Sequence, residues 1–296
     1  MTSTDDGAAA AGRRSALLHA YDSQLREDGE MSFARSVQRD GPLLRAVFDG
    51  AYGFVSYRSL VGYDAAADGG RLDDLIARTV AYFAQETQVP EFEWKTRSHD
   101  LPLDLGLRLQ AQGLVAGEAE SVMIGEASLL AAVVPLPTGV SLRRIGFDAD
   151  GGSQPEARTR ADVEQVLATQ VEVFGTSSHT TDESMYTRIV EHADVVELWA
   201  AFAREPSTGR EIVVTTGRLQ LVPGTEFAGI WGGATLPAWR GRGIYRALTA
   251  ARARSALSKG VRYLHSDSTD YSRPILERSG FLHVTSTTPY IWKRPA

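Results

Sequence analysis

Two periods of apolar and polar residues run along the chain, and together they predict its helices and strands. Apolar residues three and four positions apart indicate helices, whereas short alternating or continuous apolar runs between turn residues indicate strands. In the first half these patterns predict, in order, a helix at 15–26, strands at 43–48 and 52–57, a helix at 72–85, a strand at 91–96, a helix at 103–112 and a strand at 121–124.

The second half repeats this order with additional elements. It follows a segment at 134–140 that is rich in proline and glycine and predicts a linker. The predicted elements are a strand at 142–145, helices at 161–174 and 185–192, strands at 195–202, 212–221 and 227–235, a helix from 244, a strand at 261–268, a helix ending near Gly280 and a last strand to Trp292. One constant offset aligns Gly113 with Gly280 and Asp100 with Asp267, which indicates two tandem copies of one fold.

The clearest functional signal lies between the strand at 227–235 and the helix after it. This segment is Leu236-Pro-Ala-Trp-Arg-Gly-Arg-Gly-Ile-Tyr-Arg-Ala-Leu248. A glycine-rich turn that opens a helix directs several backbone N–H groups to one point, at the positive end of the helix dipole. Three arginines add charge, and no acidic residue occurs between Glu226 and Asp267. The segment therefore predicts a site for a phosphate or pyrophosphate.

Two common phosphate motifs do not fit this segment. The chain contains no P-loop string, and the dinucleotide fingerprint would require a third glycine where Arg246 stands. The spacing that fits is an arginine, two residues, a glycine, one residue and a small residue, here Arg240, Gly243 and position 245. With Pro237 before the arginine, it resembles the coenzyme A pyrophosphate loop of the GNAT (GCN5-related N-acetyltransferase) family.

A second signature supports the resemblance, which covers about 141–292. The strand at 261–268 is followed by Tyr271-Ser-Arg-Pro-Ile-Leu-Glu-Arg-Ser-Gly-Phe281 and a last strand, in the order that the family shows. The resemblance implies an α/β (α+β) fold of two tandem GNAT-like domains. Each would have a mixed, mostly antiparallel central sheet flanked by helices, and in the second domain two parallel strands would splay apart.

Three residues depart from the family pattern. Tyr245 replaces a small residue at the end of the loop, and Thr269 stands where asparagine is usual. Leu276 stands where the family often has the tyrosine that protonates the leaving thiolate. The first two changes leave the backbone donors in place, whereas the third removes that general acid.

The resemblance also implies the cofactor site, with acetyl-CoA as co-substrate. Backbone groups of Thr235 and Leu236 would pair with the pantetheine arm, and Thr269 and Ser272 would border it. The pyrophosphate would lie in the loop formed by Arg240, Gly241, Arg242, Gly243, Ile244, Tyr245 and Arg246.

Acceptor and catalytic residues are predicted less directly. Asp267 ends a strand near the expected splay and is a candidate base, or alternatively caps the next helix or pairs with a nearby arginine. Tyr245 is a candidate proton donor. Trp231 could line an acceptor pocket or pack in the core. His179 lies in the polar loop at 175–183, which is either a specificity loop or a solvated connection.

The first copy lacks the signature of a cofactor loop. The offset that aligns the two halves places Asp73 where the second copy has Arg240. A carboxylate at a helix N-terminus complements the helix dipole but would repel a pyrophosphate. The predicted domains are therefore a disordered tail at 1–14, a degenerate GNAT-like domain at 15–133, the linker at 134–140 and a catalytic domain at 141–296.

Composition excludes several classes of mechanism and partner. The chain has no cysteine, which excludes disulfides, zinc thiolate sites and an acyl-cysteine intermediate. A net charge of −6 argues against nucleic acid, and no apolar run reaches the length of about 18 residues that indicates a membrane span. We expect a cytoplasmic protein without a metal, as a monomer or homodimer.

The sequence thus predicts an acyl-CoA-dependent N-acyltransferase, most simply an N-acetyltransferase, that uses direct attack in a ternary complex. The acceptor would be a small-molecule or peptide amine. The alternative is a non-catalytic module that binds acyl-CoA or a partner, which the absent tyrosine at position 276 favours.

Overall fold

The structure is a computed structural model that describes residues 3–49, 51–63, 70–148, 150–175, 180–205, 207–270 and 272–295. It is a mixed α/β fold whose chain divides into two compact units. Unit 1 comprises Met1–Ile124 and Asp267–Ala296, and unit 2 comprises Gly125–Ser266. Among the described residues, no helix combines the length and apolar character needed to cross a bilayer.

Unit 1 contains a sheet with the strand order β1-β2-β3-β4-β12-β6, with β5 paired to β12. In chain order its elements are α1 (Ser3–Gln24), η1 (Glu27–Glu30), β1 (Ala34–Asp40), β2 (Leu43–Phe48), β3 (Tyr52–Tyr57), α2 (Gly70–Gln85), β4 (Glu91–Arg97), α3 (Leu105–Ala111), β5 (Val115–Ala116), β6 (Glu120–Glu126), α7 (Arg273–Arg278) and β12 (Leu282–Lys293). The apolar faces of α2, α3, β2, β3 and β4 enclose a core centred on Trp94, Phe92 and Phe83.

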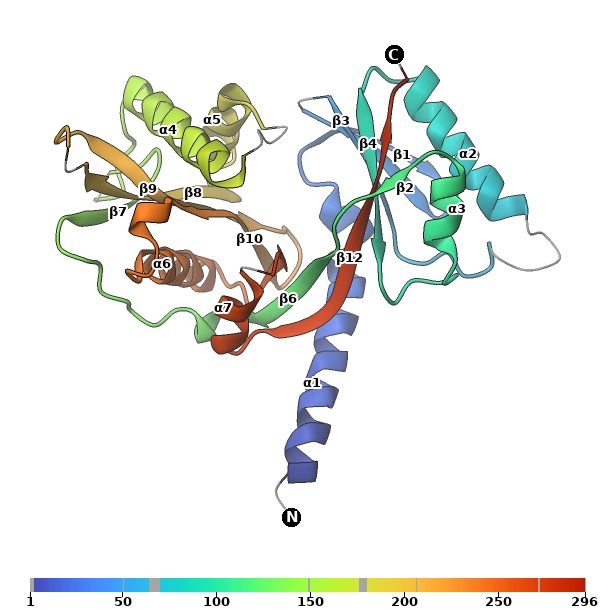
Figure 1. The fold of residues 1–296 in the computed structure, drawn as a ribbon, viewed down its shortest axis with the longest axis horizontal. Coiled ribbons are helices and arrows are strands. Elements are labelled where there is room, and N and C mark those ends of the chain that lie inside the picture. Colours follow the sequence, from blue (N-terminus) through green and yellow to red (C-terminus); the bar gives the residue numbers. More distant parts are fainter. Residues whose placement is uncertain are drawn as a thin grey trace. The chain divides into compact units, whose positions relative to one another are not determined.

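Unit 2 contains the strands β7-β8-β9-β10-β11 in that order. In chain order its elements are η3 (Ala127–Leu129), β7 (Val140–Arg144), α4 (Glu156–Phe174), α5 (Asp182–Glu191), β8 (Val196–Arg204), β9 (Glu211–Leu221), β10 (Phe227–Thr235), η4 (Pro237–Trp239), α6 (Ile244–Ser258) and β11 (Tyr263–Ser268). Neighbouring strands are antiparallel except β10 and β11, which are parallel. Helices α4 and α5 cover one face of these strands and α6 covers the other (Figure 1).

The compact units cut the chain differently from the predicted domains. The sequence divides the chain at the linker 134–140, but α7 and β12 are counted with unit 1. The reason is that β12 pairs antiparallel with β6 through its first half, Leu282–Thr287, and with β4 through its second half, Thr287–Lys293. The division into two tandem copies at 134–140 stays a prediction. In the structure, β12 at the C-terminal end packs with the strands of the first half.

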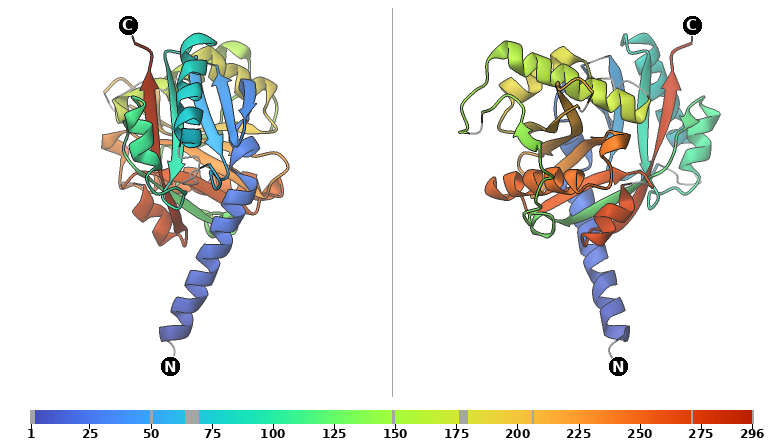
Figure 2. Two further views of the ribbon diagram at one scale, coloured as in Figure 1. Left: turned by 90° about the vertical axis from the view of Figure 1, so that its right-hand side faces the viewer. Right: turned by 60° about the vertical axis from the view of Figure 1, so that its left-hand side comes forward.

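The sequence misses two features of unit 1. The sequence predicts a disordered tail at 1–14, but α1 begins at Ser3, because the alanine-rich segment has high helix propensity. Every described side chain from Gly7 to Ala16 is exposed, and α1 is visible as the long blue helix in both views of Figure 2. Strand β1 was not predicted, since most of its side chains are exposed and its sequence lacks an apolar alternation.

Candidate active site

Strand β10 separates from its parallel neighbour β11 after a short paired stretch. The register joins Phe227–Gly229 to Tyr263–His265 and, among the described residues, goes no further. Strand β10 continues to Thr235, with a register shift against β9 between Trp231 and Ala234, where Gly232 has a φ of 62°. The backbone edge of β10 beyond Gly229 is therefore open to an extended ligand, which could pair there as an added strand does.

A glycine turn at the end of β10 opens helix α6, as the sequence predicts. Gly241 and Gly243 have φ values of 72° and 78°, a left-handed conformation that residues with a Cβ rarely adopt. Helical bonding begins with the N–H of Ala247, which donates to the carbonyl of Gly243 at 3.0 Å. The N–H groups of Ile244, Tyr245 and Arg246 consequently have no acceptor inside the helix and point out of its N-terminus.

Apolar side chains fix this turn to the sheet. Ile244 is only 1% exposed and packs in a cluster with Val214 and Ala201, against which Leu236 and Trp239 also lie. Since the side chain of Ile244 is buried, only its backbone N–H can meet a ligand. The donors of the turn are thus held by the core of unit 2.

The charge around the turn is positive. Arg240, Arg242 and Arg246 are exposed, and none of them forms a salt bridge with a described residue. The Nε of Arg240 donates to the carbonyl of Thr235 at 3.0 Å, and the guanidinium of Arg242 lies 4.8 Å from the ring centroid of Trp239. Backbone donors, a helix dipole and arginines without carboxylate partners together make a site suited to a pyrophosphate.

The backbone groups of the two predicted strand residues differ. The N–H of Leu236 donates to Val214 of β9 at 3.0 Å, and its carbonyl accepts from Trp239 at 2.9 Å. Both groups of Leu236 are thus used within unit 2. The carbonyl of Thr235 points to the other edge, where it meets Arg240. Thr235 is therefore the residue whose backbone lies on the open edge of β10.

The bulky residue at position 245 is accommodated by a glycine in β10. A Cβ on Gly233 would lie 2.8 Å from the Tyr245 ring, so the ring occupies the space that this glycine leaves. On the inner side Tyr245 neighbours Arg252, a buried cation of α6. Burial lowers the pKa of Arg252, and the Tyr245 hydroxyl opposes this shift. Sequence spacing gives no sign of this tertiary fit.

Asp267 is one of the last two residues of β11, which are counted with unit 1, as are Thr269 and Ser272. The Asp267 side chain is 8% exposed, and its Oδ2 lies 2.5 Å from Nζ of Lys95. Burial alone would lower the pKa of Lys95, but Asp267 first and then Tyr21 raise it above its ordinary value. This ion pair favours the structural alternative for Asp267 over the role of base.

Thr269 and Ser272 shape the start of α7. The Thr269 carbonyl accepts the N–H groups of Ser272 and Arg273 at 3.1 Å and 3.0 Å. Leu276, on the same helix, is 1% exposed, so this position provides packing and no proton donor.

The corresponding region of unit 1 is closed by its own residues. Strands β3 and β4 are parallel from Tyr52 to Val55, and beyond this point the carbonyl of Tyr57 accepts Nε of Arg26 at 2.9 Å. The side-chain hydroxyl of the neighbouring Ser56 accepts the N–H of Glu27 at 3.1 Å. At the start of α2, Asp73 forms a salt bridge of 3.0 Å with Arg108. An acidic helix start and an occupied strand edge support the interpretation that this copy binds no coenzyme A.

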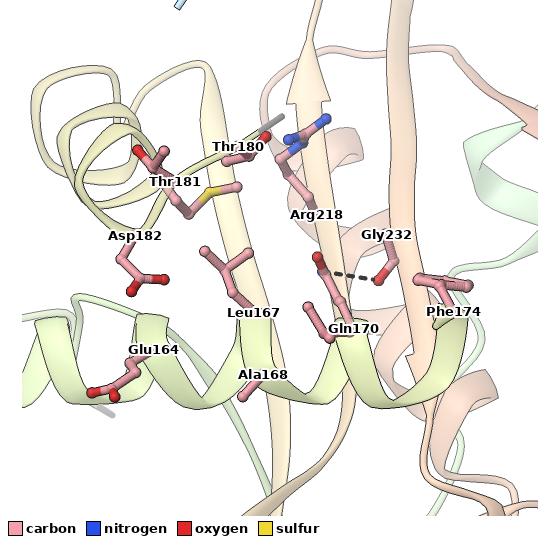
Figure 3. Close-up of a pocket in the computed structure, with 12 residues that line it drawn as sticks. Glu164, Leu167, Ala168, Gln170, Phe174, Thr180, Thr181, Asp182, Arg218 and Gly232 are labelled. Atoms are coloured by element: carbon pink, nitrogen blue, oxygen red, sulfur yellow. Dashed lines mark hydrogen bonds between the residues drawn. The ribbon is translucent and has the colours of Figure 1, made fainter. Parts of the chain in front are cut away.

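A pocket of about 660 Å³ lies on the face of unit 2 that α4 and α5 cover (Figure 3). Its lining comes from α4, α5, β9 and the glycine bulge of β10, and consists of Glu164, Leu167, Ala168, Gln170, Val171, Phe174, Thr180, Thr181, Asp182, Met185, Arg218 and Gly232. Gln170 closes one side by donating to the carbonyl of Gly232 at 3.3 Å. This volume is typical of a small-molecule site.

The sequence predicts the residues that line this pocket only in part. Trp231 is not among its lining residues, because its ring folds back over Gly229 and packs in a T-shaped arrangement with the His265 ring, 5.1 Å between centroids. His179 lies outside the described residues, although Thr180 of the same loop lines the pocket. Arg218 was missed, since a single arginine in a strand carries no spacing signal.

Solved structures share this fold over most of the chain. A GCN5-related N-acetyltransferase from Kribbella flavida superposes with a TM-score of 0.61 at 13% identity, with 95% of each chain covered. A tandem GNAT protein from the clavulanic acid biosynthesis pathway gives 0.57 at 16% identity, over 90% of this chain and 87% of that one. A GCN5-related N-acetyltransferase from Sphaerobacter thermophilus gives 0.57 at 17% identity, over 86% and 78%.

No protein-family model matches the sequence, and no curated protein matches it. The structural likeness shows that the chain has the fold of the GNAT acetyltransferases.

Proposed function

We propose that unit 2 is an acyl-CoA-dependent N-acyltransferase that uses acetyl-CoA. The observation that carries the proposal is the open edge of β10 leading directly into the glycine turn of α6. An extended arm that pairs with this edge at Thr235 would have its pyrophosphate end at the exposed N–H groups and arginines of Arg240–Arg246. The family resemblance and the fold of the solved neighbours agree with this ligand.

The reaction needs one nucleophile and one leaving group. The acceptor amine, after losing a proton, attacks the thioester carbonyl carbon, and the C–S bond breaks as the C–N bond forms. The leaving thiolate takes up one proton. A thiol has an ordinary pKa of about 8.5, so its thiolate leaves without a strong general acid at position 276.

In this proposal, residues of unit 2 position the reactants. A backbone N–H on the open edge of β10 would polarise the thioester carbonyl, an effect worth about 3 kcal/mol. The pocket beside Gly232 would hold the amine, because it adjoins the bulge at which β10 and β11 have separated. The acceptor would thus reach the thioester from the α4 and α5 face.

Thiol release from acetyl-CoA across a panel of amines tests the proposal. The protein has no cysteine, so a thiol reagent detects only coenzyme A. We expect amine-dependent release in the wild type and much weaker release in Gly243→Asp at the same low acetyl-CoA concentration. Micromolar coenzyme A binding without release on any amine would instead support the non-catalytic module. Absence of coenzyme A binding would reject both the enzyme and a module that binds acyl-CoA.

A further inference from the structure

One cation in the pocket of unit 2 has no counter-ion within the described structure. Arg218, on β9, lines the pocket and forms no salt bridge with any described residue. Its Nε is buried without a hydrogen-bond partner. Burial, and then the nearby charge of Arg188, lower the pKa of Arg218 to about 10. A guanidinium kept charged in such a place is stabilised when an anion binds beside it.

Apolar side chains form the wall of the pocket next to this cation. Val171 and Phe174 of α4 line the pocket and are 44% and 54% exposed, so both have apolar surface free to contact a ligand. Leu167 and Met185 complete the wall. In Figure 3, Leu167 lies between Arg218 and the carboxylates of Glu164 and Asp182, so the two signs of charge occupy opposite ends. The pocket therefore suits a ligand with an apolar body and an anionic group at one end.

The position of Arg218 places that anionic group close to the reacting amine. Arg218 is the register partner of Trp231, which directly precedes Gly232 of the β10 bulge. An anion at Arg218 thus lies next to the strand that would carry the thioester. A ligand that presents its amine there must have its amine and its anion only a few bonds apart.

We propose that the acceptor is an amino carboxylate with an apolar body, and that Arg218 binds its carboxylate. This inference rests on the proposed function and narrows its substrate to the class of apolar amino acids. The planar guanidinium offers a carboxylate two parallel hydrogen bonds, which lysine cannot reproduce. The apolar body would cover Val171 and Phe174.

The test compares L-leucine, L-phenylalanine and L-methionine with their amides, which have nearly the same shape but lack the charge of the carboxylate. We expect kcat/KM for the acids to exceed that for the amides, although an α-amino group next to an amide loses its proton more readily. In Arg218→Gln, kcat/KM for the acids should fall about 100-fold, the scale for removing one partner of a buried charge pair. In the same variant, kcat/KM for the amides should change by less than about 3-fold. For the acids, kcat/KM of Arg218→Lys should lie between the values of the wild type and of Arg218→Gln.

Controls separate this inference from the proposed function. Coenzyme A affinity should be the same in wild type, Arg218→Gln and Arg254→Gln, the last an exposed arginine of α6 outside the pocket. Equal use of acids and amides by the wild type, or an equal loss for both in Arg218→Gln, would overturn the role of Arg218. If coenzyme A binds but no amine releases thiol, the proposed function fails. Calorimetry of L-phenylalanine with the coenzyme A complex then tests Arg218 alone. No binding by the wild type, or the same affinity in wild type and Arg218→Gln, would reject the role of Arg218.

Discussion

The glycine turn before α6 provides the sharpest test of the cofactor site. Gly243 has a φ of 78°, and a Cβ built there meets no atom within 4 Å. A side chain at this position therefore adds backbone strain of about 1 kcal/mol but no clash. The strain falls equally on asparagine and aspartate, which have nearly the same shape. The pair Gly243→Asn and Gly243→Asp thus isolates the effect of one negative charge.

The size of that effect follows from Coulomb's law. A carboxylate at the N-terminus of α6 would lie roughly 5 Å from a bound phosphate, where two unit charges repel by about 3 kcal/mol at an effective dielectric constant near 20. Because 1.4 kcal/mol is a factor of ten, coenzyme A affinity should fall by about 100-fold in Gly243→Asp relative to Gly243→Asn. The difference should shrink as salt rises, since the loop is exposed.

Calorimetry with coenzyme A at low and high salt measures this difference. Gly260→Asp is the matched control, because Gly260 has a φ of 79°, meets no atom within 4 Å and follows the other end of α6. It carries the same strain and charge away from the turn, and its coenzyme A affinity should stay within about 3-fold of the wild type. Equal affinities of the Asn and Asp variants of Gly243 would refute a phosphate at this turn.

Other predictions concern both units. Asp73→Ala should leave coenzyme A affinity unchanged in calorimetry, because this carboxylate belongs to a salt bridge of unit 1, and a large loss would show a second cofactor site. Lys95→Met should lower the free energy of unfolding in urea by about 3–5 kcal/mol, since it removes the cation that the buried Asp267 carboxylate contacts; an unchanged midpoint would contradict this. Arg97 and Lys95 hold the pKa of Glu30 below its ordinary 4.5 against the opposing effect of burial, so its stabilisation is present above pH 4.5 and is lost as pH falls below it. Acid titration should therefore destabilise wild type more than Glu30→Gln, and parallel curves would exclude this role. Gly233→Ala should destabilise unit 2 by about 1–3 kcal/mol through a Cβ 2.8 Å from Tyr245, and Tyr245→Ala should relieve most of that cost in the double variant.

Local sequence patterns predict the helices and strands of this protein well where the buried residues recur with the period of the helix or strand. Strands β2, β3 and β10 have the predicted bounds, because short-range alternation and turn residues specify them. The glycine turn of α6 is local as well, since left-handed φ values and a helix start depend on adjacent residues. Strand β1 was missed for the opposite reason, as its exposed side chains leave no apolar pattern.

Residues that are distant in sequence decide the rest. Lys95 and Asp267 lie far apart in the chain, and only the packing of unit 1 pairs them, which favours the structural alternative for this candidate base. Arg218 draws its role from a pocket whose walls come from α4, α5 and β10.

The sequence by itself determined the order of the elements, the fold that they imply and the phosphate-type turn at Arg240–Arg246, because each depends on neighbouring residues. Tertiary structure decided where the C-terminal strand packs, why Tyr245 fits against Gly233 and which cation faces the pocket. These features arise where separate elements meet in space, and no period in the sequence records such a meeting.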